Sequence, residues 1–394
     1  MEKWEKGAVI LACDELHEKI RGKTVALMMN NAALDNEGRP LIDVIVEERW
    51  ADVKFFFGME HGVRGELQAG NSDKGGKDIK TGITIVDLYQ YPDRIPPVEF
   101  IEQVDAVVYC TQDAGIRHWT FTPWLMELIN SSAKAKREVI ILDRPNPIRG
   151  DIVEGLCAEK YILQKLMSGF EYPLRHGMTI GELALMYNDI KNIGAELTVL
   201  KMKGWKRDMW YEDTGLLWQP ISPNIPTVES LLHFGTTGLL QSSNISIGIA
   251  TTTPFQYIGE ESFDGEELAR ELNSRNIPGV FFLPKYYMAR TGHWLADQRG
   301  VSREIKLCNG VLPVIKDRDV YRSVDTQLHI IDALIKLYPD YINLESNTSH
   351  GRVRMQTDEV VNAAKEKKSV LPLIDKWRNS ANEFMKQRER YLLY

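Results

Sequence analysis

Residues 53–65 combine a short apolar run with a glycine-rich polar loop, and read Val53-Lys54-Phe55-Phe56-Phe57-Gly58-Met59-Glu60-His61-Gly62-Val63-Arg64-Gly65. A continuous apolar run of this kind is typical of a strand that is buried on both faces of a parallel sheet. Similar runs occur at 24–29, 84–89, 106–110 and 139–142. Longer polar or amphipathic stretches separate them, as the crossovers of a parallel sheet require. The first part of the chain is therefore predicted to form a doubly wound, Rossmann-like α/β domain.

Polar side chains follow these runs, where the strands are expected to end. Because the carboxyl ends of parallel strands meet at one edge of a sheet, we expect the side chains to gather at a single rim. Three carboxylates are expected there, namely Glu60, Asp113 and Asp143. Side chains that could hold a polar ligand are Asn30, His61, Arg64, Gln112, Arg117, Arg144 and Asn146. Each of these residues could instead only shape or brace a loop, but the cluster as a whole favours a site for a polar substrate.

Length and composition limit the class of protein. The 394 residues allow two to three domains, and 43% hydrophobic with 26% charged residues is ordinary for a globular protein. A net charge of −7 argues against a nucleic-acid-binding surface. No window approaches the apolar length of a membrane span. The first residues, MEKWEK, do not resemble a signal peptide, so a cytoplasmic location is expected unless a leader was removed.

Several signatures of cofactor and metal sites do not occur in the sequence. Residues 30–35 do not match GxGxxG, and there is no GxxxxGK[ST] loop, HExxH pair or GxSxG elbow. The four cysteines form no CxxC pair, so buried thiols are expected instead of a metal site. We therefore expect no cofactor and no metal. A nucleotide-dependent enzyme that uses the Rossmann-like sheet is a further hypothesis, although the sequence lacks these phosphate-binding motifs.

The second part of the chain supplies helices and an aromatic stretch. Residues 179–182 fit a capping box that opens a helix, and further helices are expected at 325–338 and 373–391. The stretch 203–226 contains three tryptophans, Trp205 among them. Such rings could stack on the faces of a sugar or pack in an interior. A boundary near residue 190 would divide the chain into domains at 1–190 and 191–394.

The ordered motifs of the whole chain resemble those of the exo-β-N-acetylmuramidase family, long catalogued as a domain of unknown function. The segments that carry the resemblance are Gly58–Gly65, Gln112–Arg117, Asp143–Pro147, Val153–Gly155, Arg175–Glu182, Met202–Arg207, Ser222–Thr227, Thr253–Phe255 and Tyr391–Tyr394. The resemblance implies a Rossmann-like domain, a smaller α/β domain and a cleft between them. The implied activity is release of N-acetylmuramic acid from the non-reducing ends of peptidoglycan fragments, with a small amino sugar or muropeptide as substrate.

The resemblance also implies site residues. Glycoside hydrolysis usually uses two carboxyls, and Glu60 and Glu154 match family motifs, with Asp113 and Asp143 as rivals. The acetamido group of the substrate could also act as the nucleophile, so that only one protein acid is needed. The lactyl carboxylate of the sugar calls for a cation, for which the candidates are Arg64, Arg117, Arg144 and Arg175. His176 and Trp205 also lie in family motifs and are expected to bind the sugar.

One segment departs from the family pattern. Relatives tend to show an acidic-Gly-Thr-Asn segment followed by Ser-Glu-Gly-Arg-Gly, whereas residues 241–250 here read QSSNISIGIA. Gln241 and Ile247 thus replace acidic residues. Met59 and His118-Trp119 are smaller departures. The alternative hypothesis is therefore a relative with altered specificity, or one that binds amino sugars or muropeptides without hydrolysing them.

Overall fold

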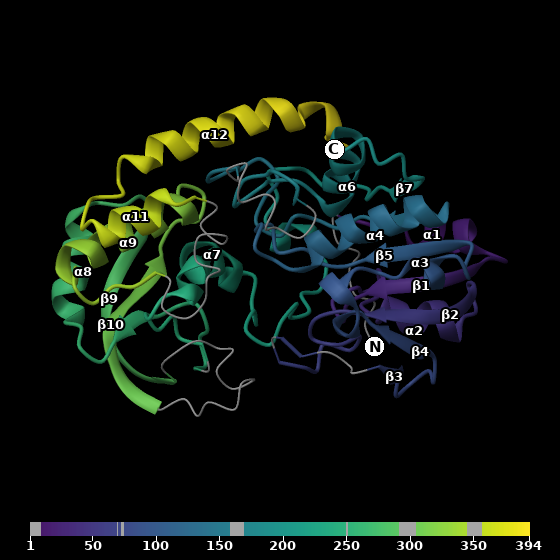
Figure 1. The fold of residues 1–394 in the computed structure, drawn as a ribbon, viewed down its shortest axis with the longest axis horizontal. Helices are drawn as coiled ribbons and strands as arrows, with labels where there is room; N and C mark the ends of the chain where they lie inside the picture. The colour runs from purple at the N-terminus through teal and green to yellow at the C-terminus, as the bar shows by residue number, and fades with distance from the viewer. Residues whose placement is uncertain are drawn as a thin grey trace. The chain divides into compact units, whose positions relative to one another are not determined.

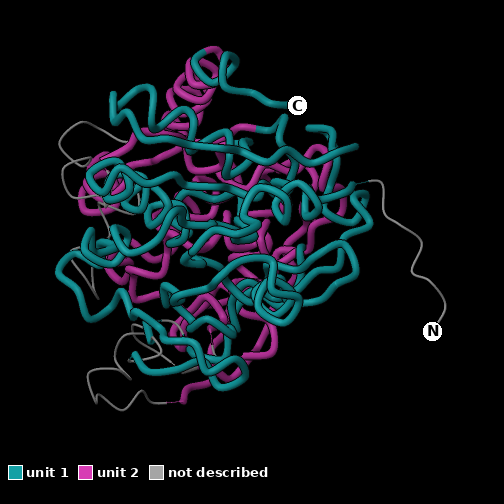
Figure 2. Tube along the Cα trace, turned by 90° about the vertical axis from the view of Figure 1, so that its right-hand side faces the viewer, with its two compact units in different colours: residues 1–152, 177–228, 387–394 teal, residues 153–176, 229–386 magenta. Residues whose placement is uncertain are grey.

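The chain forms two compact units in the computed structural model, which describes residues 9–68, 70–71, 75–157, 169–249, 251–290, 305–344 and 357–394 (Figure 1). Unit 1 consists of residues 1–152, 177–228 and 387–394, and unit 2 consists of residues 153–176 and 229–386 (Figure 2). Both units draw on segments that are far apart in the sequence. The boundary near residue 190 and the cleft between domains stay predictions.

Unit 1 is built on a seven-stranded sheet with the order β3-β4-β2-β1-β5-β6-β7. The strands are β1 (Thr24–Met29), β2 (Asp52–Gly58), β3 (Gly76–Lys77), β4 (Thr84–Asp87), β5 (Ala106–Cys110), β6 (Glu138–Leu142) and β7 (Leu197–Leu200). All neighbouring strands are parallel except β3, which is antiparallel to β4. The strand order reverses between β1 and β5, where Rossmann-like sheets bind their ligands. The predicted fold class is confirmed.

Both faces of this sheet are buried, which explains the continuous apolar runs. Alternate residues of β1, among them Val25 and Leu27, pack in one core with helices α1 (Cys13–Ile20) and α2 (Leu41–Glu47). The intervening residues Ala26 and Met28 point to the opposite face and are also fully buried. Helix α4 (Phe121–Ala135) contacts β6, α3 (Val98–Ile101) and α6 (Ile180–Ile190). A strand that is covered on both faces does not need to alternate apolar and polar residues along its length.

Helix α6 begins as the sequence predicts. The Thr179 side chain accepts a hydrogen bond from the backbone N–H of Glu182, and the Glu182 side chain accepts one from the backbone N–H of Thr179. This reciprocal pair is a capping box, and it satisfies two N–H groups that the helix itself leaves unpaired. Its place after β6 brings the start of α6 beside Asp143.

Unit 2 contains a smaller antiparallel sheet of three strands in the order β8-β10-β9. The strands are β8 (Ile258–Glu260), β9 (Val280–Arg290) and β10 (Ile305–Ile315). The helices in the described part of this unit are α7 (Glu229–Thr237), α8 (Gly265–Ser274), α9 (Ser323–Leu337), α11 (Glu359–Lys365) and most of α12 (Leu373–Arg388). A second, smaller α/β unit agrees with the prediction. Within the described ranges, no helix has the length and apolar character needed to cross a bilayer.

Candidate active site

Hydrogen bonds tie together the loops at the carboxyl ends of β1, β5 and β6. The buried Arg144 guanidinium donates from Nε to Gln112 Oε1 over 3.2 Å and from Nη1 to the carbonyl oxygen of Leu34 over 2.8 Å. Gln112 in turn donates from Nε2 to the carbonyl oxygen of Pro145 over 2.9 Å. The structure thus brings Arg144 and Gln112 together as predicted. Both side chains hold the rim in shape.

Asn146 also braces this rim. Its Nδ2 donates to the carbonyl oxygen of Met178 over 3.0 Å, and its Oδ1 accepts from the N–H of Ile148 over 3.1 Å. Asn30, which follows β1, is only 4% exposed, and its Oδ1 accepts from the N–H of Ala32. Its Nδ2 has no hydrogen-bond partner among the described residues. A buried donor without a partner is costly, so Asn30 is suited to donate to a ligand oxygen.

Glu60 lies in the loop after β2 and is bound by uncharged donors. Its Oε1 accepts from the N–H of Gly70 over 3.0 Å, and its Oε2 accepts from Thr120 Oγ1 over 2.7 Å. Its exposed fraction is 8%. Burial, and then the charge of Glu60, raises the pKa of the neighbouring Tyr89. The Glu60 carboxyl is therefore largely shielded from solvent, and both of these hydrogen bonds come from uncharged groups.

His61 stands beside Glu60 in a left-handed backbone conformation, with φ of 72°. Its Nδ1 lies 2.8 Å from the carbonyl oxygen of Leu67. Because a carbonyl oxygen only accepts hydrogen bonds, Nδ1 is the donor in this contact, and Nε2 is the ring nitrogen left to meet a ligand.

Asp113 and Asp143 hold turns and helix ends in place. Asp113 accepts from the N–H of Gly115 over 2.8 Å and from Thr122 Oγ1 over 2.9 Å. Thr122, in the first turn of α4, thus bonds a carboxylate, and Thr120 is the N-cap residue of this helix. Gly115 is required here, because a Cβ at this position would lie 2.6 Å from Asn146 Oδ1. Arg117, two residues further on, is buried.

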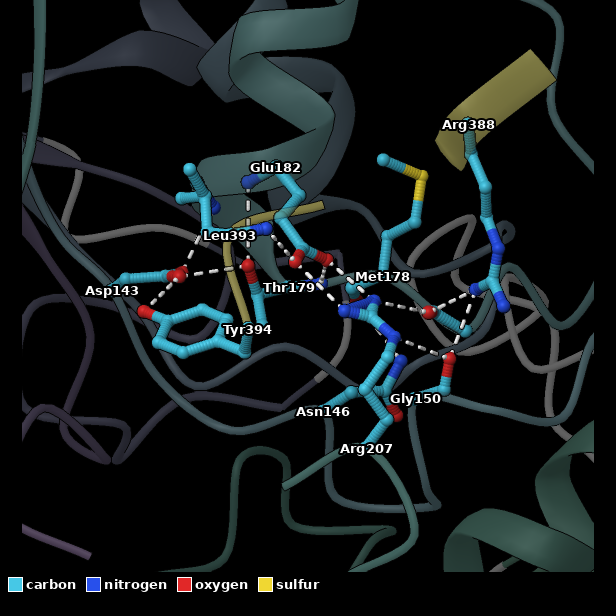
Figure 3. A network of polar contacts seen from close by, with 12 residues as sticks. Asp143, Asn146, Gly150, Met178, Thr179, Glu182, Arg207, Arg388, Leu393 and Tyr394 are labelled. Carbon is cyan, nitrogen blue, oxygen red and sulfur yellow. Dashed lines mark hydrogen bonds and ion pairs between the residues drawn. The ribbon is translucent and has the colours of Figure 1, made fainter. Parts of the chain in front are cut away.

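Asp143 belongs to a polar network that sequence analysis did not foresee (Figure 3). Its carboxylate accepts from Thr179 Oγ1 over 2.7 Å, from the N–H of Gly181 over 2.9 Å and from the hydroxyl of Tyr394 over 2.9 Å. Burial raises the pKa of Asp143, and these hydrogen bonds oppose that rise.

Glu182 is the second carboxyl of this network. It binds Arg207, with Oε1 2.8 Å from Nη1 and Oε2 2.7 Å from Nη2, and its Oε1 also accepts from the N–H of Leu393 over 2.8 Å (Figure 3). Burial raises its pKa to about 7, although Arg207 acts in the opposite direction. The sequence indicated only the helix cap at Glu182. Arg207 and Tyr394 lie in segments that resemble the family's motifs, but no local sequence pattern linked either residue to Glu182.

Arg64, a candidate for ligand binding, is engaged by two carboxylates. Its Nη1 lies 2.7 Å from Asp43 Oδ1, its Nε lies 2.8 Å from Asp78 Oδ1, and its Nη2 lies 2.7 Å from Asp78 Oδ2. The hydrogen bonds from Asp78 and Asp43 raise the pKa of Arg64 against the effect of burial. Its guanidinium therefore holds the loop after β2 against α2.

Glu154, Arg175 and His176 belong to unit 2. Glu154 Oε1 lies 2.6 Å from Arg175 Nη1, and Glu154 Oε2 accepts from the N–H of Val324 over 2.9 Å. Val324 lies in the first turn of α9, where a carboxylate is stabilised by the helix dipole. His176 is buried, with its ring 5.7 Å from that of Tyr172.

Trp205 is buried in the core of unit 1 with β1 and β5 residues. Its ring packs edge-on against that of Tyr394 at 5.1 Å. This position favours the packing interpretation of Trp205 over the sugar-stacking one. Among the residues the structure describes, no group of three or more His, Cys, Asp or Glu side chains is placed to hold a metal ion.

The parallel sheet with its polar rim, together with a second unit built on a small antiparallel sheet, defines a two-domain α/β protein suited to a polar substrate. The family profiles for the N-terminal and C-terminal parts of the exo-β-N-acetylmuramidase NamZ match residues 25–229 and 232–394. The chain therefore belongs to the NamZ family, whose members are glycoside hydrolases.

Individual relatives agree with this assignment. The chain is 33% identical over 383 residues to the peptidoglycan β-N-acetylmuramidase NamZ of Bacillus subtilis (strain 168), covering 96% of this chain and 88% of that protein. A crystal structure of a DUF1343 family protein from Bacteroides fragilis is 30% identical, with a TM-score of 0.86 and coverage of 98% and 99% of the two chains. A second such protein from the same organism is 24% identical, with a TM-score of 0.75, and supports the fold alone.

Proposed function

We propose that this chain is an exo-acting glycoside hydrolase that releases N-acetylmuramic acid from the non-reducing ends of peptidoglycan fragments, a step of cell-wall turnover. The substrate follows from the Bacillus subtilis relative, which is described as a peptidoglycan β-N-acetylmuramidase. The observation that carries the proposal is the environment of Glu60, a rim carboxyl with uncharged hydrogen-bond partners.

The reaction needs a carboxylic acid that protonates the leaving oxygen of the glycosidic bond. Asp113 and Asp143 hold a turn and a helix start, and Glu154 is paired with Arg175. Glu60 has no such structural task beyond its bonds to Gly70 and Thr120, so we assign it the role of general acid. Thr120 Oγ1 would then fix the orientation of the carboxyl.

A second carboxyl is needed only if the substrate does not supply the nucleophile. With Glu154, Asp113 or Asp143 in that role, water or the carboxylate itself would attack the anomeric carbon. With the acetamido oxygen of the sugar as nucleophile, Glu60 alone would give its proton to the leaving oxygen. Asn30 Nδ2, His61 Nε2 and Arg117 are the groups we propose to bind the sugar. The buried, unpartnered Asn30 Nδ2 supports this role most directly.

The test is the substitution Glu60→Gln, which removes the transferable proton and keeps the shape of the side chain. We expect kcat for release of N-acetylmuramic acid from a chromogenic muramide to fall by about 10²- to 10⁴-fold. The matched control is Glu66→Gln, which makes the same change at an exposed position of the same loop. Undiminished turnover by a folded Glu60→Gln variant would refute the assignment.

One observation favours the alternative of a relative with altered specificity or without catalysis. Ile247 lies in the segment that departs from the family pattern, and its side chain is buried. Calorimetry with the wild-type protein and a muropeptide decides between the two. Binding without any release of sugar would support the alternative, whereas turnover would support hydrolysis.

We also propose a cytoplasmic location, supported by the four cysteines, all of which are free thiols. Free thiols are typical of proteins in a reducing compartment. Recovery of the protein outside the cytoplasmic fraction of its host cells would contradict this proposal.

A further inference from the structure

The last residues of the sequence are part of unit 1. Helix α12 begins in unit 2, but residues Gln387–Tyr394 are counted with the Rossmann-like sheet. We call Gln387–Tyr394 the C-terminal strap. It is attached to unit 1 by the side chain of Arg388, the backbone N–H of Leu393 and the hydroxyl of Tyr394 (Figure 3).

Tyr394 joins the carboxyl ends of two strands. Its hydroxyl donates to Asp143 Oδ2 over 2.9 Å, directly after β6, and accepts from the N–H of Met202 over 3.0 Å, just beyond β7. Its ring packs against Trp205. A Phe at this position would keep the ring contact and lose both hydrogen bonds.

Leu393 and Arg388 attach the strap at two other places. The N–H of Leu393 donates to Glu182 Oε1 at the start of α6. Arg388 Nη1 donates to the carbonyl oxygens of Gly150 and Gly177. These two glycines flank residues 153–176, the part of the chain that leaves unit 1 and returns to it. Arg388 of the strap therefore joins the two places in unit 1 between which the chain runs through unit 2.

Asp143 connects the strap to the candidate active site. The next residue, Arg144, bonds both Gln112 in the loop after β5 and Leu34 in the loop after β1. A displacement of Asp143 would therefore be transmitted to the rim loops that carry the proposed sugar-binding groups. Catalysis is sensitive to such shifts, because a misplacement of about 1 Å can cost roughly 10²-fold in rate.

We propose that Tyr394 is a positioning residue of the active site, acting through Asp143 on the rim loops. The expected change in kcat rests on the proposed function, whereas the expected change in hydrogen exchange does not. No strap residue belongs to the candidate catalytic groups, so the effect on turnover is indirect.

The test is the variant Tyr394→Phe, measured with and without substrate. We expect hydrogen exchange to accelerate at the amides within residues 143–148, namely those of Asp143, Arg144, Asn146 and Ile148, since residues 145 and 147 are prolines. We also expect kcat to fall by roughly 10-fold or more while KM changes by less than about 3-fold. The matched control is Tyr391→Phe on the same strap, whose hydroxyl bonds Asp189 of α6 instead of the rim. That variant should keep wild-type exchange at 143–148 and wild-type kcat.

A purely structural role gives a different result. Tyr394→Phe would then lower the melting temperature and leave kcat and KM per folded molecule unchanged, which would overturn the proposal. Unchanged exchange at 143–148 would overturn it as well. If Tyr394→Phe does not fold, Leu393→Pro, which removes the N–H donated to Glu182, should give the same split between kcat and KM. The exchange measurement needs no substrate, so it still tests the strap if wild-type protein releases no sugar.

Discussion

Arg64 forms a cluster of charged side chains with Asp43 and Asp78. Asp78 is almost fully buried, with 1% of its side chain exposed. Burial alone would raise its pKa, but hydrogen bonds from Arg64 and Thr81 outweigh that effect and hold the pKa well below its usual range. The pair is therefore ionised in the folded protein at neutral pH.

Removal of Arg64 should be strongly destabilising. Arg64→Ala leaves Asp43 and Asp78 without their common counter-ion, and breaking a buried pair in this way costs about 3–5 kcal/mol. Because 22% of the Arg64 side chain is exposed, we expect the lower end of that range in urea unfolding at pH 7. The control is Lys80→Ala, which removes a 51% exposed partner of Asp43 and should cost less than about 1 kcal/mol.

The same cluster gives a pH dependence with a defined sign. A carboxyl whose folded-state pKa is depressed contributes stability that is present above the unfolded-state pKa of about 4 and is lost as the pH falls. Wild-type protein should therefore lose more stability below pH 4 than Arg64→Ala does. If the unfolding free energies of the two proteins fell in parallel as the pH was lowered below 4, the role assigned to Arg64 would be contradicted.

The residues at the rim could be predicted, but their individual tasks could not. Glu60, Asp113 and Asp143 all follow apolar runs and look equivalent in the sequence. The groups that distinguish Glu60 from Asp143 are Thr120 and Tyr394, which lie far from them along the chain. Only folding brings Thr120 to Glu60 and Tyr394 to Asp143, so the spacing of residues along the sequence did not indicate these contacts.

At the scale of elements, helix α6 shows how local and distant interactions overlap. Its capping box was readable because Thr179 and Glu182 are three residues apart, the spacing that the box requires. The contacts of the same two side chains with Asp143 and Leu393 are not local and were not predicted. The start of α6 thus depends on both kinds of contact.

Gly181 at the start of α6 should not tolerate a methyl group. Glycine-to-alanine changes within helices usually stabilise by up to about 1 kcal/mol. Here an added Cβ would lie 2.5 Å from Val199 Cγ1 and 2.9 Å from Asp143 Cγ. We expect Gly181→Ala to destabilise by about 1–3 kcal/mol in thermal unfolding, since an overpacked site must shift its neighbours. A variant as stable as wild type would show that Val199 of β7 and Asp143 move aside for the added methyl group at little cost in free energy.

Glu182 should make stability fall as the pH rises towards neutrality. Burial raises its folded-state pKa from 4.5 to about 7, so the folded state holds the proton more tightly than the unfolded state. The charged and titratable groups around it are Arg207, Arg388, Asp143 and Tyr394. The resulting stabilisation is complete below about pH 4.5 and is lost as the pH rises through about 7.

The measurement compares wild type with Glu182→Gln, which cannot titrate. The unfolding free energy of wild type minus that of Glu182→Gln should fall by up to roughly 3 kcal/mol between pH 4.5 and pH 8. A difference that grows over this interval would mean that the ion pair with Arg207 dominates.

At the scale of the whole molecule, the chain alternates between its two units. Unit 1 takes in residues 1–152, 177–228 and 387–394, so it includes the C-terminal strap, although the strands of its sheet all lie between Thr24 and Leu200. Apolar runs predicted the strands well because burial on both faces leaves a local signature. The return of residues 387–394 leaves none, since it depends on contacts with Asp143, Glu182 and Gly150.

The Rossmann-like order of the sheet makes a nucleotide the obvious alternative ligand, and the first crossover argues against it. Dinucleotide sites place a glycine-rich turn and a helix N-terminus after the first strand, where the backbone N–H groups bind phosphate. Here β1 is followed by Asn30-Asn31-Ala32, and α2 starts only at Leu41. The first turn of α2 also carries Asp43, whose carboxylate already pairs with Arg64 and Lys80 at this place.

We therefore expect NAD, FAD and ATP to leave the melting temperature unchanged at millimolar concentration, while N-acetylmuramic acid raises it. A ligand at about 100 times its dissociation constant stabilises the folded state by about 2.7 kcal/mol, which is a shift of a few degrees for a chain of this size. Glu66→Gln, changed only at an exposed position, should respond to the sugar as wild type does. A nucleotide that raised the melting temperature as much as the sugar would restore the nucleotide-dependent interpretation of this sheet.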